Sequence, residues 1–217
     1  MMRRARNLVS IILWAGLALQ LGGCACACRQ DKVATAAATP APVTAQPDAI
    51  APADDDTITP LPEPPSPEAA TLTEVGRDAP AFTVATLGGE PFSLGAQKGK
   101  VVLVNWFATW CGPCKAEMPH LKDRVWEAFK GNPDFVMISI SREEDAAKVA
   151  PFVAERALPW TIGLDTDRTA YARYAEAYIP RNHVIGRDGR IVFQSEGFEE
   201  AEFAAMITAI AGELAGR

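Results

Sequence analysis

The sequence predicts an α/β domain that follows a long segment without a core. An apolar run of strand length, VVLVNWFA at residues 101–108, is followed by a helical pattern. A second apolar run, DFVMISIS at residues 134–141, is followed by another. Because strands joined through a helix lie parallel in one sheet, both runs should form its centre. From residue 29 to about residue 76, by contrast, no helical or strand period occurs.

The first 21 residues have the pattern of an export signal. Three arginines precede the apolar run LVSIILWAGLALQL, and small residues follow it, which is typical of a secretory signal peptide. The segment ends in LGGC, which resembles the lipobox of bacterial lipoproteins, whose cysteine is lipidated and becomes the mature N-terminus. By that resemblance Cys24 carries a lipid. An ordinary signal peptide or an uncleaved anchor would also export the domain, and spacing gives Cys26 and Cys28 no defined partners.

The segment that follows is rich in alanine, threonine, proline and acidic residues, and it includes TPAPVTAQPDAIAPADDDTITPLPEPPSPEAAT. Such a composition cannot bury a core and predicts a disordered linker. We therefore expect a lipoprotein signal peptide over residues 1–23, a lipidated N-terminus and linker over 24–75, and one folded domain over 76–217. The linker would allow an anchored domain to meet partners away from the bilayer.

The formal net charge is −6, and the linker carries much of the acidic excess. The folded part has only a small excess of acidic residues and no cluster of lysine and arginine. Neither a nucleic-acid footprint nor a polybasic membrane patch is present. We expect no nucleic-acid partner and a monomer.

The first half of the domain predicts a hairpin, a central strand and a helix. Residues 82–87 and 91–94 flank the turn Gly88-Gly89 and predict a small hairpin. The run 101–108 is continuously apolar, which predicts a strand buried on both faces. In the following helix, apolar residues recur on one stripe. They are Cys114, Met118, Leu121 and Val125.

The second half predicts a strand at residues 134–141 and an amphipathic helix at 143–156. A short helix is expected at about 169–177. The segments HVIG and RIVFQS flank Arg187-Asp188-Gly189, which predicts a second hairpin. A last helix is expected at 199–214, with an apolar inner face. This face contains Phe203, Ile207, Ile210 and Leu214.

The stretch FATWCGPCKAEMP contains Cys111 and Cys114, for which three interpretations compete. A structural zinc site needs four ligands, and the domain adds only His120 and His183, which lack the usual spacing. A purely structural disulfide would close a very short loop and constrain little chain. A redox pair explains more of the surrounding residues.

A C-x-x-C motif directly after a buried strand places the first sulfur at the start of a helix. There the unpaired backbone N–H groups and the helix dipole favour a thiolate. Cys111 would then be the nucleophile, and Cys114, one turn further in, would attack the resulting mixed disulfide. Gly112 permits the tight turn, and Pro113 suits a first helical turn. We expect no metal and no cofactor beyond this pair.

The segment NWFATWCGPCKAEMP resembles the active site of the thioredoxin superfamily, and in particular that of membrane-anchored TlpA/ResA-like thiol:disulfide oxidoreductases of bacteria. The resemblance covers about residues 75–212. It implies a thioredoxin fold, with three α/β/α layers and a mixed central sheet led by an N-terminal β-hairpin. It also implies that Cys111 attacks, that Cys114 resolves, and that Pro180 is a cis-proline facing the disulfide. Pro119 matches the kink proline of the active-site helix.

By the same resemblance, the substrate-binding surface comprises Trp110, Gly112, Pro113, Ile179 and Pro180. A cis Ile179–Pro180 bond would expose main-chain groups that can pair with an extended substrate. From the residues alone, a trans turn proline at this position stays open.

Asn105 stands where thioredoxin has a buried aspartate that accepts and donates protons. Because Asn105 cannot titrate, either another residue takes this role or the role is absent. Glu117, three residues after Cys114, matches a functional glutamate of ResA-like proteins. Helical spacing places it near Cys114, and burial would raise its pKa enough for proton transfer. The alternative is a solvated helix glutamate.

A second departure from the family is Arg181-Asn182-His183, where relatives have small hydroxyl residues and then an aromatic residue. We expect His183 to fill the place of that aromatic ring in a strand. Arg181 would favour an acidic partner.

The resemblance implies a protein-disulfide reductase in the bacterial cell envelope, facing the periplasm and recharged by an upstream membrane electron donor. Apocytochrome c maturation or periplasmic redox homeostasis are the roles that it suggests. Two alternatives stay open. A peroxiredoxin-like peroxidase would share the fold, although Ala108-Thr109-Trp110-Cys111 departs from the T-x-x-C pattern. A non-catalytic peptide-binding or chaperone module is the other.

Overall fold

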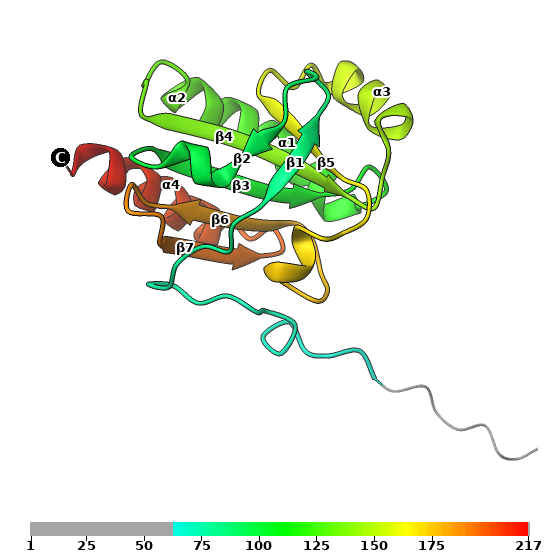
Figure 1. Cartoon of the computed structure of the whole chain (residues 1–217), viewed down its shortest axis with the longest axis horizontal. Helices are drawn as coiled ribbons and strands as arrows, with labels where there is room; N and C mark the ends of the chain where they lie inside the picture. Colours follow the sequence, from blue (N-terminus) through cyan, green and yellow to red (C-terminus); the bar gives the residue numbers. More distant parts are fainter. Residues whose placement is uncertain (1–62, 217) are drawn as a thin grey trace, which may run out of the picture. The chain divides into compact units, whose positions relative to one another are not determined.

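The computed structural model describes residues 63–216. The expected signal peptide, most of the linker, and Cys24, Cys26 and Cys28 lie outside the described residues. A mixed seven-stranded sheet forms the centre of the domain, in the order β2-β1-β5-β4-β3-β6-β7 (Figure 1). The strands are β1 Thr83–Thr86, β2 Phe92–Ser93, β3 Val101–Phe107, β4 Phe135–Arg142, β5 Thr161–Asp165, β6 Arg181–Ile185 and β7 Ile191–Glu196.

The helical elements connect the strands and follow the last of them. They are the 3₁₀-helix η1 Leu94–Gln97, α1 Gly112–His120, the π-helix η2 Leu121–Trp126, α2 Glu127–Phe129, α3 Ala146–Arg156, the 3₁₀-helix η3 Tyr171–Arg173 and α4 Glu200–Ala215. Within residues 63–216 no helix has both the length and the apolar character needed to cross a membrane.

Strand β3 lies in the interior of the sheet, and all seven of its residues are buried. It pairs with β4 in parallel and with β6 antiparallel, which confirms the expected parallel pair. In this register Asn105 is the direct partner of Ser139 on one side and of Asn182 on the other. Because direct partners project to the same face of a sheet, three polar side chains lie in one row across the core.

Strand β5 was not expected from the sequence. It pairs with β4 and β1, so it joins the N-terminal hairpin to the centre of the sheet. A Cβ atom at Gly163 would lie 3.0 Å from Val84 Cγ2 and 3.1 Å from Ile140 Cγ1. The glycine lets side chains of both neighbouring strands approach closely. The strand is only five residues long and contains this glycine, so the sequence shows no clear strand pattern there.

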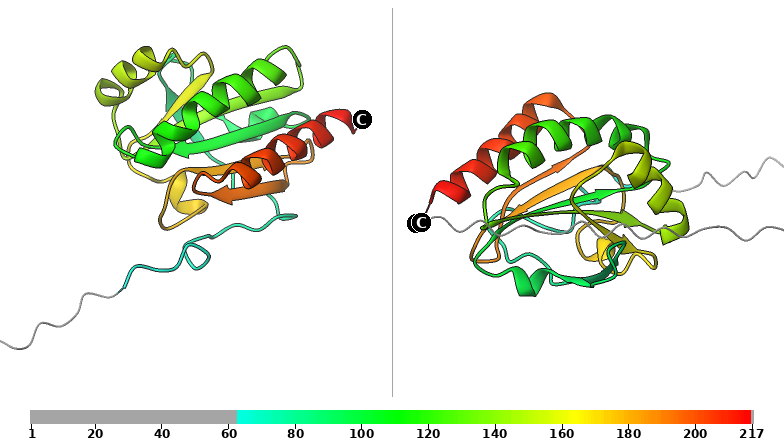
Figure 2. Two further views of the ribbon diagram at one scale, coloured as in Figure 1. Left: turned by 180° about the vertical axis from the view of Figure 1, so that it is seen from behind. Right: turned by 90° about the horizontal axis from the view of Figure 1, so that it is seen from above.

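Helices α1, α3 and α4 cover one face of the sheet (Figure 2). The predicted stripe of α1 and η2 is confirmed, because Cys114, Met118, Leu121 and Val125 are all buried. Pro119 lies inside α1, directly before the wider turns of η2, as expected for a kink proline. The inner face of α4 buries Phe203, Met206 and Ile210, whereas the expected Ile207 and Leu214 are partly buried.

The opposite face carries an aromatic cluster that includes Phe82, Trp106, Tyr171 and Tyr174. The helix expected at 169–177 is only the single 3₁₀ turn of η3 there. The layer on this side is therefore thin. Both expected hairpins are present, formed by β1 with β2 and by β6 with β7.

The N-terminal boundary of the packed region differs from the expectation. Residues before 76 were assigned to the linker, but Ala70 is buried and Thr71 forms a β-bridge with Ala175. Thr73 Oγ1 donates a hydrogen bond to Gln194 Oε1 at 2.9 Å. A segment without a regular period can still pack when individual side chains and backbone groups find partners on the finished sheet.

Arg181 ties this N-terminal segment to the sheet. Its guanidinium donates to Thr71 Oγ1 at 2.8 Å and forms a 3.1 Å ion pair with Glu196. Its side chain is only 2% exposed. The expectation that Arg181 recognises an acidic partner is therefore wrong, because its charge is already neutralised inside the domain.

Candidate redox site

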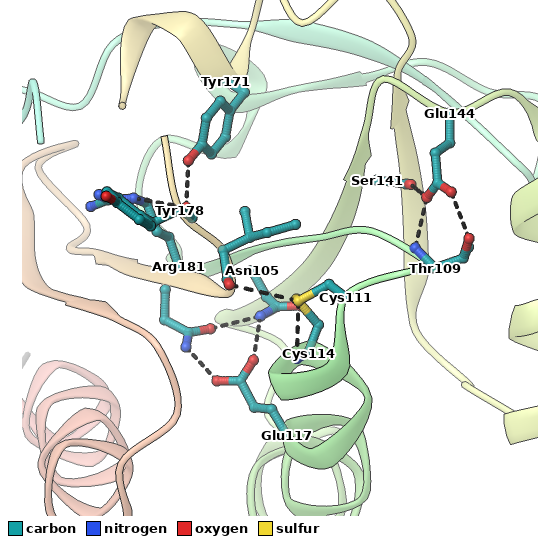
Figure 3. The surroundings of a disulfide bond; sticks show 12 residues. Asn105, Thr109, Cys111, Cys114, Glu117, Ser141, Glu144, Tyr171, Tyr178 and Arg181 are labelled. Carbon is teal, nitrogen blue, oxygen red and sulfur yellow. Dashed lines mark hydrogen bonds between the residues drawn. A yellow bond between two sulfur atoms is a disulfide. The ribbon is translucent and has the colours of Figure 1, made fainter. Parts of the chain in front are cut away.

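Cys111 and Cys114 form a disulfide at the junction of β3 and α1, with Cα atoms 5.3 Å apart (Figure 3). Cys111 is the N-cap residue, and its Sγ accepts the backbone N–H of Cys114 at 3.2 Å. Gly112 and Pro113 form the first turn and are exposed. Cys111 is 4% exposed and Cys114 is fully buried. The first sulfur can therefore meet a partner, and a capping N–H stabilises its thiolate form.

The loop before β6 lies against this pair. The Ile179–Pro180 peptide bond is cis, as expected. The Ile179 carbonyl oxygen is 3.6 Å from Cys111 Sγ. The Tyr171 hydroxyl lies 2.7 Å from the carbonyl oxygen of Ala177 and 2.5 Å from that of Tyr178, so its single proton is shared between two carbonyl groups of the loop.

Two exposed aromatic side chains adjoin these elements in the sequence. Trp110, directly before Cys111, is 62% exposed, and Tyr178, directly before Ile179, is 36% exposed. They are suited to cover a peptide whose sulfur approaches Cys111.

Glu117 is fully buried in α1, so the solvated alternative is wrong. Its Oε2 accepts the Asn105 amide N–H at 3.0 Å, and its Oε1 accepts that of Asn182 at 2.6 Å. Burial raises the pKa of Glu117 to about 7, against the lowering effect of these two hydrogen bonds. A carboxyl group with such a pKa can both accept and release a proton near neutral pH.

Asn105 does not titrate, and it occupies the strand position where thioredoxin carries its aspartate. It links Glu117 to two other buried polar residues. Its Nδ2 also donates to Asn182 Oδ1 at 2.9 Å, and its Oδ1 accepts the Ser139 hydroxyl at 2.9 Å. The titratable group near the cysteines therefore lies on the helix, and the strand supplies its hydrogen-bond donors.

Glu144 is a site residue that the sequence analysis missed. Its buried carboxylate accepts the backbone N–H of Thr109 at 2.7 Å, the Thr109 hydroxyl at 2.5 Å and the Ser141 hydroxyl at 2.7 Å. It therefore fixes the loop that leads into Cys111. The sequence analysis placed Glu144 in a helix that was expected to begin at residue 143. In the structure this helix begins only at Ala146, after the N-cap Asp145.

The two histidines of the domain do not join the cysteines. His120 packs against Phe198, with ring centroids 4.8 Å apart. His183 lies in β6 edge-on to Tyr174, which confirms that it fills an aromatic place, and burial lowers its pKa to about 3. In the part of the chain that the structure describes, no three His, Cys, Asp or Glu side chains are grouped as metal ligands.

The comparisons with known proteins agree with this geometry. The model of the Redoxin family matches residues 74–210. The chain is 30% identical over 129 residues to the thiol-disulfide oxidoreductase ResA of Bacillus thuringiensis, covering 59% of this chain and 73% of ResA.

Solved structures give the same result for the fold. The solution structure of a candidate protein disulfide isomerase from Bacteroides thetaiotaomicron is 35% identical to this chain, with a TM-score of 0.65, and the match covers 67% of this chain and 93% of that one. A thiol:disulfide interchange protein of the thioredoxin family from Chlorobium tepidum is 26% identical, with a TM-score of 0.54 and coverage of 63% and 95%. The chain thus belongs to the Redoxin family and is a ResA-like thiol:disulfide oxidoreductase with a thioredoxin fold.

Proposed function

We propose that this protein reduces disulfides of partner proteins outside the cytoplasm of a bacterium. The observation that carries the proposal is the buried carboxyl of Glu117, held one helical turn from Cys114 beneath a capped Cys111. This arrangement supplies a nucleophile at the surface and a proton acceptor in the interior. Both are needed to complete the reduction of a partner.

The reaction begins with the reduced cysteine pair. The Cys111 thiolate attacks one sulfur of the partner's disulfide, a new S–S bond forms between the two proteins, and the partner's second sulfur leaves as a thiolate. The N–H of Cys114 and the start of α1 stabilise the attacking thiolate. The cis-proline loop and Trp110 hold the partner chain beside it.

Resolution requires a thiolate at Cys114, which is fully buried. Its thiol transfers a proton to the Glu117 carboxylate, and the thiolate then attacks Cys111 Sγ. The Cys111–Cys114 disulfide forms, the bond to the partner breaks, and the partner leaves with two electrons as a dithiol after proton uptake. The structure has the cysteine pair in this final, oxidised state.

The same group serves the return step. When a dithiol donor attacks Cys111, Cys114 leaves as a thiolate, and protonated Glu117 returns the proton to it. Glu117 therefore assists Cys114 in both half-reactions, as a base when the pair reduces a partner and as an acid when a donor reduces the pair; the net direction, as a reductase, is part of the proposal. We propose that the donor is a membrane protein with a dithiol, and that no cofactor besides the cysteine pair takes part.

The location and the clients belong to this proposal. A lipid on Cys24, which lies outside the described residues, would anchor the protein in the cell envelope and orient it towards the periplasm. Clients would be extended chains with accessible disulfides, such as apocytochrome c before haem attachment.

Replacing Cys111 with Ser should abolish reduction of insulin disulfides in the presence of dithiothreitol, because no other sulfur of the site reaches the surface. Replacing Cys114 with Ser should instead trap mixed disulfides through Cys111, visible on non-reducing gels and by mass spectrometry. Full activity of Cys111→Ser, or faster alkylation of Cys114 than of Cys111 in the reduced domain, would contradict the assigned roles.

Replacing Glu117 with Gln should slow resolution of a preformed mixed disulfide by roughly a hundredfold at neutral pH, since general acid–base assistance is lost. The sign of the pH dependence follows from the raised pKa: the active base is the carboxylate, so the wild-type rate should rise through about pH 7. The Gln variant should lack this rise. Stopped-flow rates that overlay the wild type from about pH 5 to 9 would contradict the role.

Replacing Cys24 with Ala should release the protein from the membrane fraction without changing the redox activity of the purified domain, because the lipid would be lost and the active site would be untouched. Intact-mass analysis of the mature wild-type protein provides the control. A mature N-terminus without a lipid would remove the anchor from the proposal.

A further inference from the structure

We propose that Trp160 and Ser139 are positioning residues for the proton transfer: a hydrogen-bond chain of fixed direction runs from the Trp160 indole through Ser139 and Asn105 to the Glu117 carboxylate. The inference rests on the proposed function of Glu117 and adds the residues that orient it. Trp160 and Ser139 are buried and form no hydrogen bond with either cysteine.

The direction of the chain follows from the chemistry of its first member. The Trp160 indole N–H can only donate, and it lies 2.9 Å from Ser139 Oγ. Ser139 therefore accepts there and uses its single proton to donate to Asn105 Oδ1 at 2.9 Å. The Asn105 amide is thus fixed with its oxygen towards Ser139 and its Nδ2 towards Glu117 Oε2, at 3.0 Å.

The orientation of the Asn105 amide also determines the orientation of the Asn182 amide. Its Oδ1 accepts the second proton of Asn105 Nδ2 at 2.9 Å, which leaves its own Nδ2 to donate to Glu117 Oε1 at 2.6 Å. Both carboxylate oxygens therefore face N–H groups. The register of β4, β3 and β6 makes this possible, since Ser139, Asn105 and Asn182 are direct partners on one face of the sheet.

A reversed Asn105 amide would have the opposite effect on Glu117. Its Oδ1 would then face Glu117 Oε2, and two acceptors would meet in a buried place where electrostatic interactions are strong. The carboxyl could relieve this contact only by keeping its proton. Glu117 would then be a poorer proton acceptor for Cys114 near neutral pH.

In the described part of the chain, no hydrogen bond or ion pair joins Glu117 to a charged side chain. The hydrogen bonds that shift its pKa come from Asn105 and Asn182, and no charged side chain contributes to the shift. On β6, His183 lies on the opposite face, against Tyr174. On α4 the buried residues are apolar. Besides Cys114, the other ionisable side chains on α1 are exposed Lys115 and partly buried His120, which packs against Phe198. Burial raises the pKa of Glu117, and the two amides are the groups that lower it again, so their orientation affects its protonation.

The protein offers a matched control for Trp160. Trp106 is also buried, in β3 on the face opposite to Asn105, but its indole N–H has no hydrogen-bond partner among the described residues. Replacing either tryptophan with Phe removes one N–H group and part of one ring. Only the replacement of Trp160 interrupts the hydrogen-bond chain that leads to Glu117.

The experiment measures the resolution rate of a preformed mixed disulfide against pH for the full-length protein and four variants. Trp160→Phe and Ser139→Ala should be about threefold or more slower than wild type near pH 7, with a midpoint displaced to higher pH and recovery near pH 9. Trp106→Phe should keep the wild-type midpoint. Glu117→Gln should lack the pH-dependent rise altogether.

The outcomes separate this inference from the proposed function. A Glu117→Gln profile that overlays wild type would overturn the role of Glu117 itself. If Glu117→Gln loses the rise but Trp160→Phe and Ser139→Ala keep the wild-type midpoint, or if Trp106→Phe shifts it equally, only the positioning chain is overturned. Because Trp160→Phe retains an aromatic ring in the core, it tests the chain even if Ser139→Ala does not fold.

Discussion

The site depends on the burial of one carboxyl group, that of Glu117, which lies between a helix and the sheet and forms no ion pair with a cation. Two amide N–H groups compensate Glu117 instead, and they do so only in part. Burial without a counter-charge keeps the pKa near neutrality, whereas an ion pair would lower it. The carboxyl is therefore suited to move a proton, and the surrounding polar side chains are arranged to serve it.

The fold places the two cysteines in different environments on the same turn. Cys111 lies at the edge, where the helix start, the cis-proline loop and exposed Trp110 meet. Cys114 points into the core, where water does not reach and a thiolate needs a local proton acceptor. The sulfur that would attack a partner is thus the more exposed of the two, and the sulfur that would release it is buried. Glu144 stabilises the loop that leads to both.

The features that local pattern determines could be predicted from the sequence. The strand at Val101–Phe107, the stripe of α1, both hairpins and the pairing of Cys111 with Cys114 all rest on neighbouring residues. The features that were missed depend on register between distant segments. Asn105, Ser139 and Asn182 become neighbours only when three strands align, and Arg181 finds Thr71 and Glu196 only in the finished domain. A single sequence carries no signal for such pairings.

The most direct measurement is the titration of the Glu117 side chain itself, by NMR of the carboxyl carbon in selectively labelled, oxidised protein. The account predicts a single transition with a midpoint at about pH 7, because burial dominates over the two amide hydrogen bonds. The signal should vanish in a Glu117→Gln sample, which assigns it. A midpoint near the ordinary glutamate value of about 4.3 would contradict the account, since the carboxylate would then be too weak a base to receive the proton of Cys114.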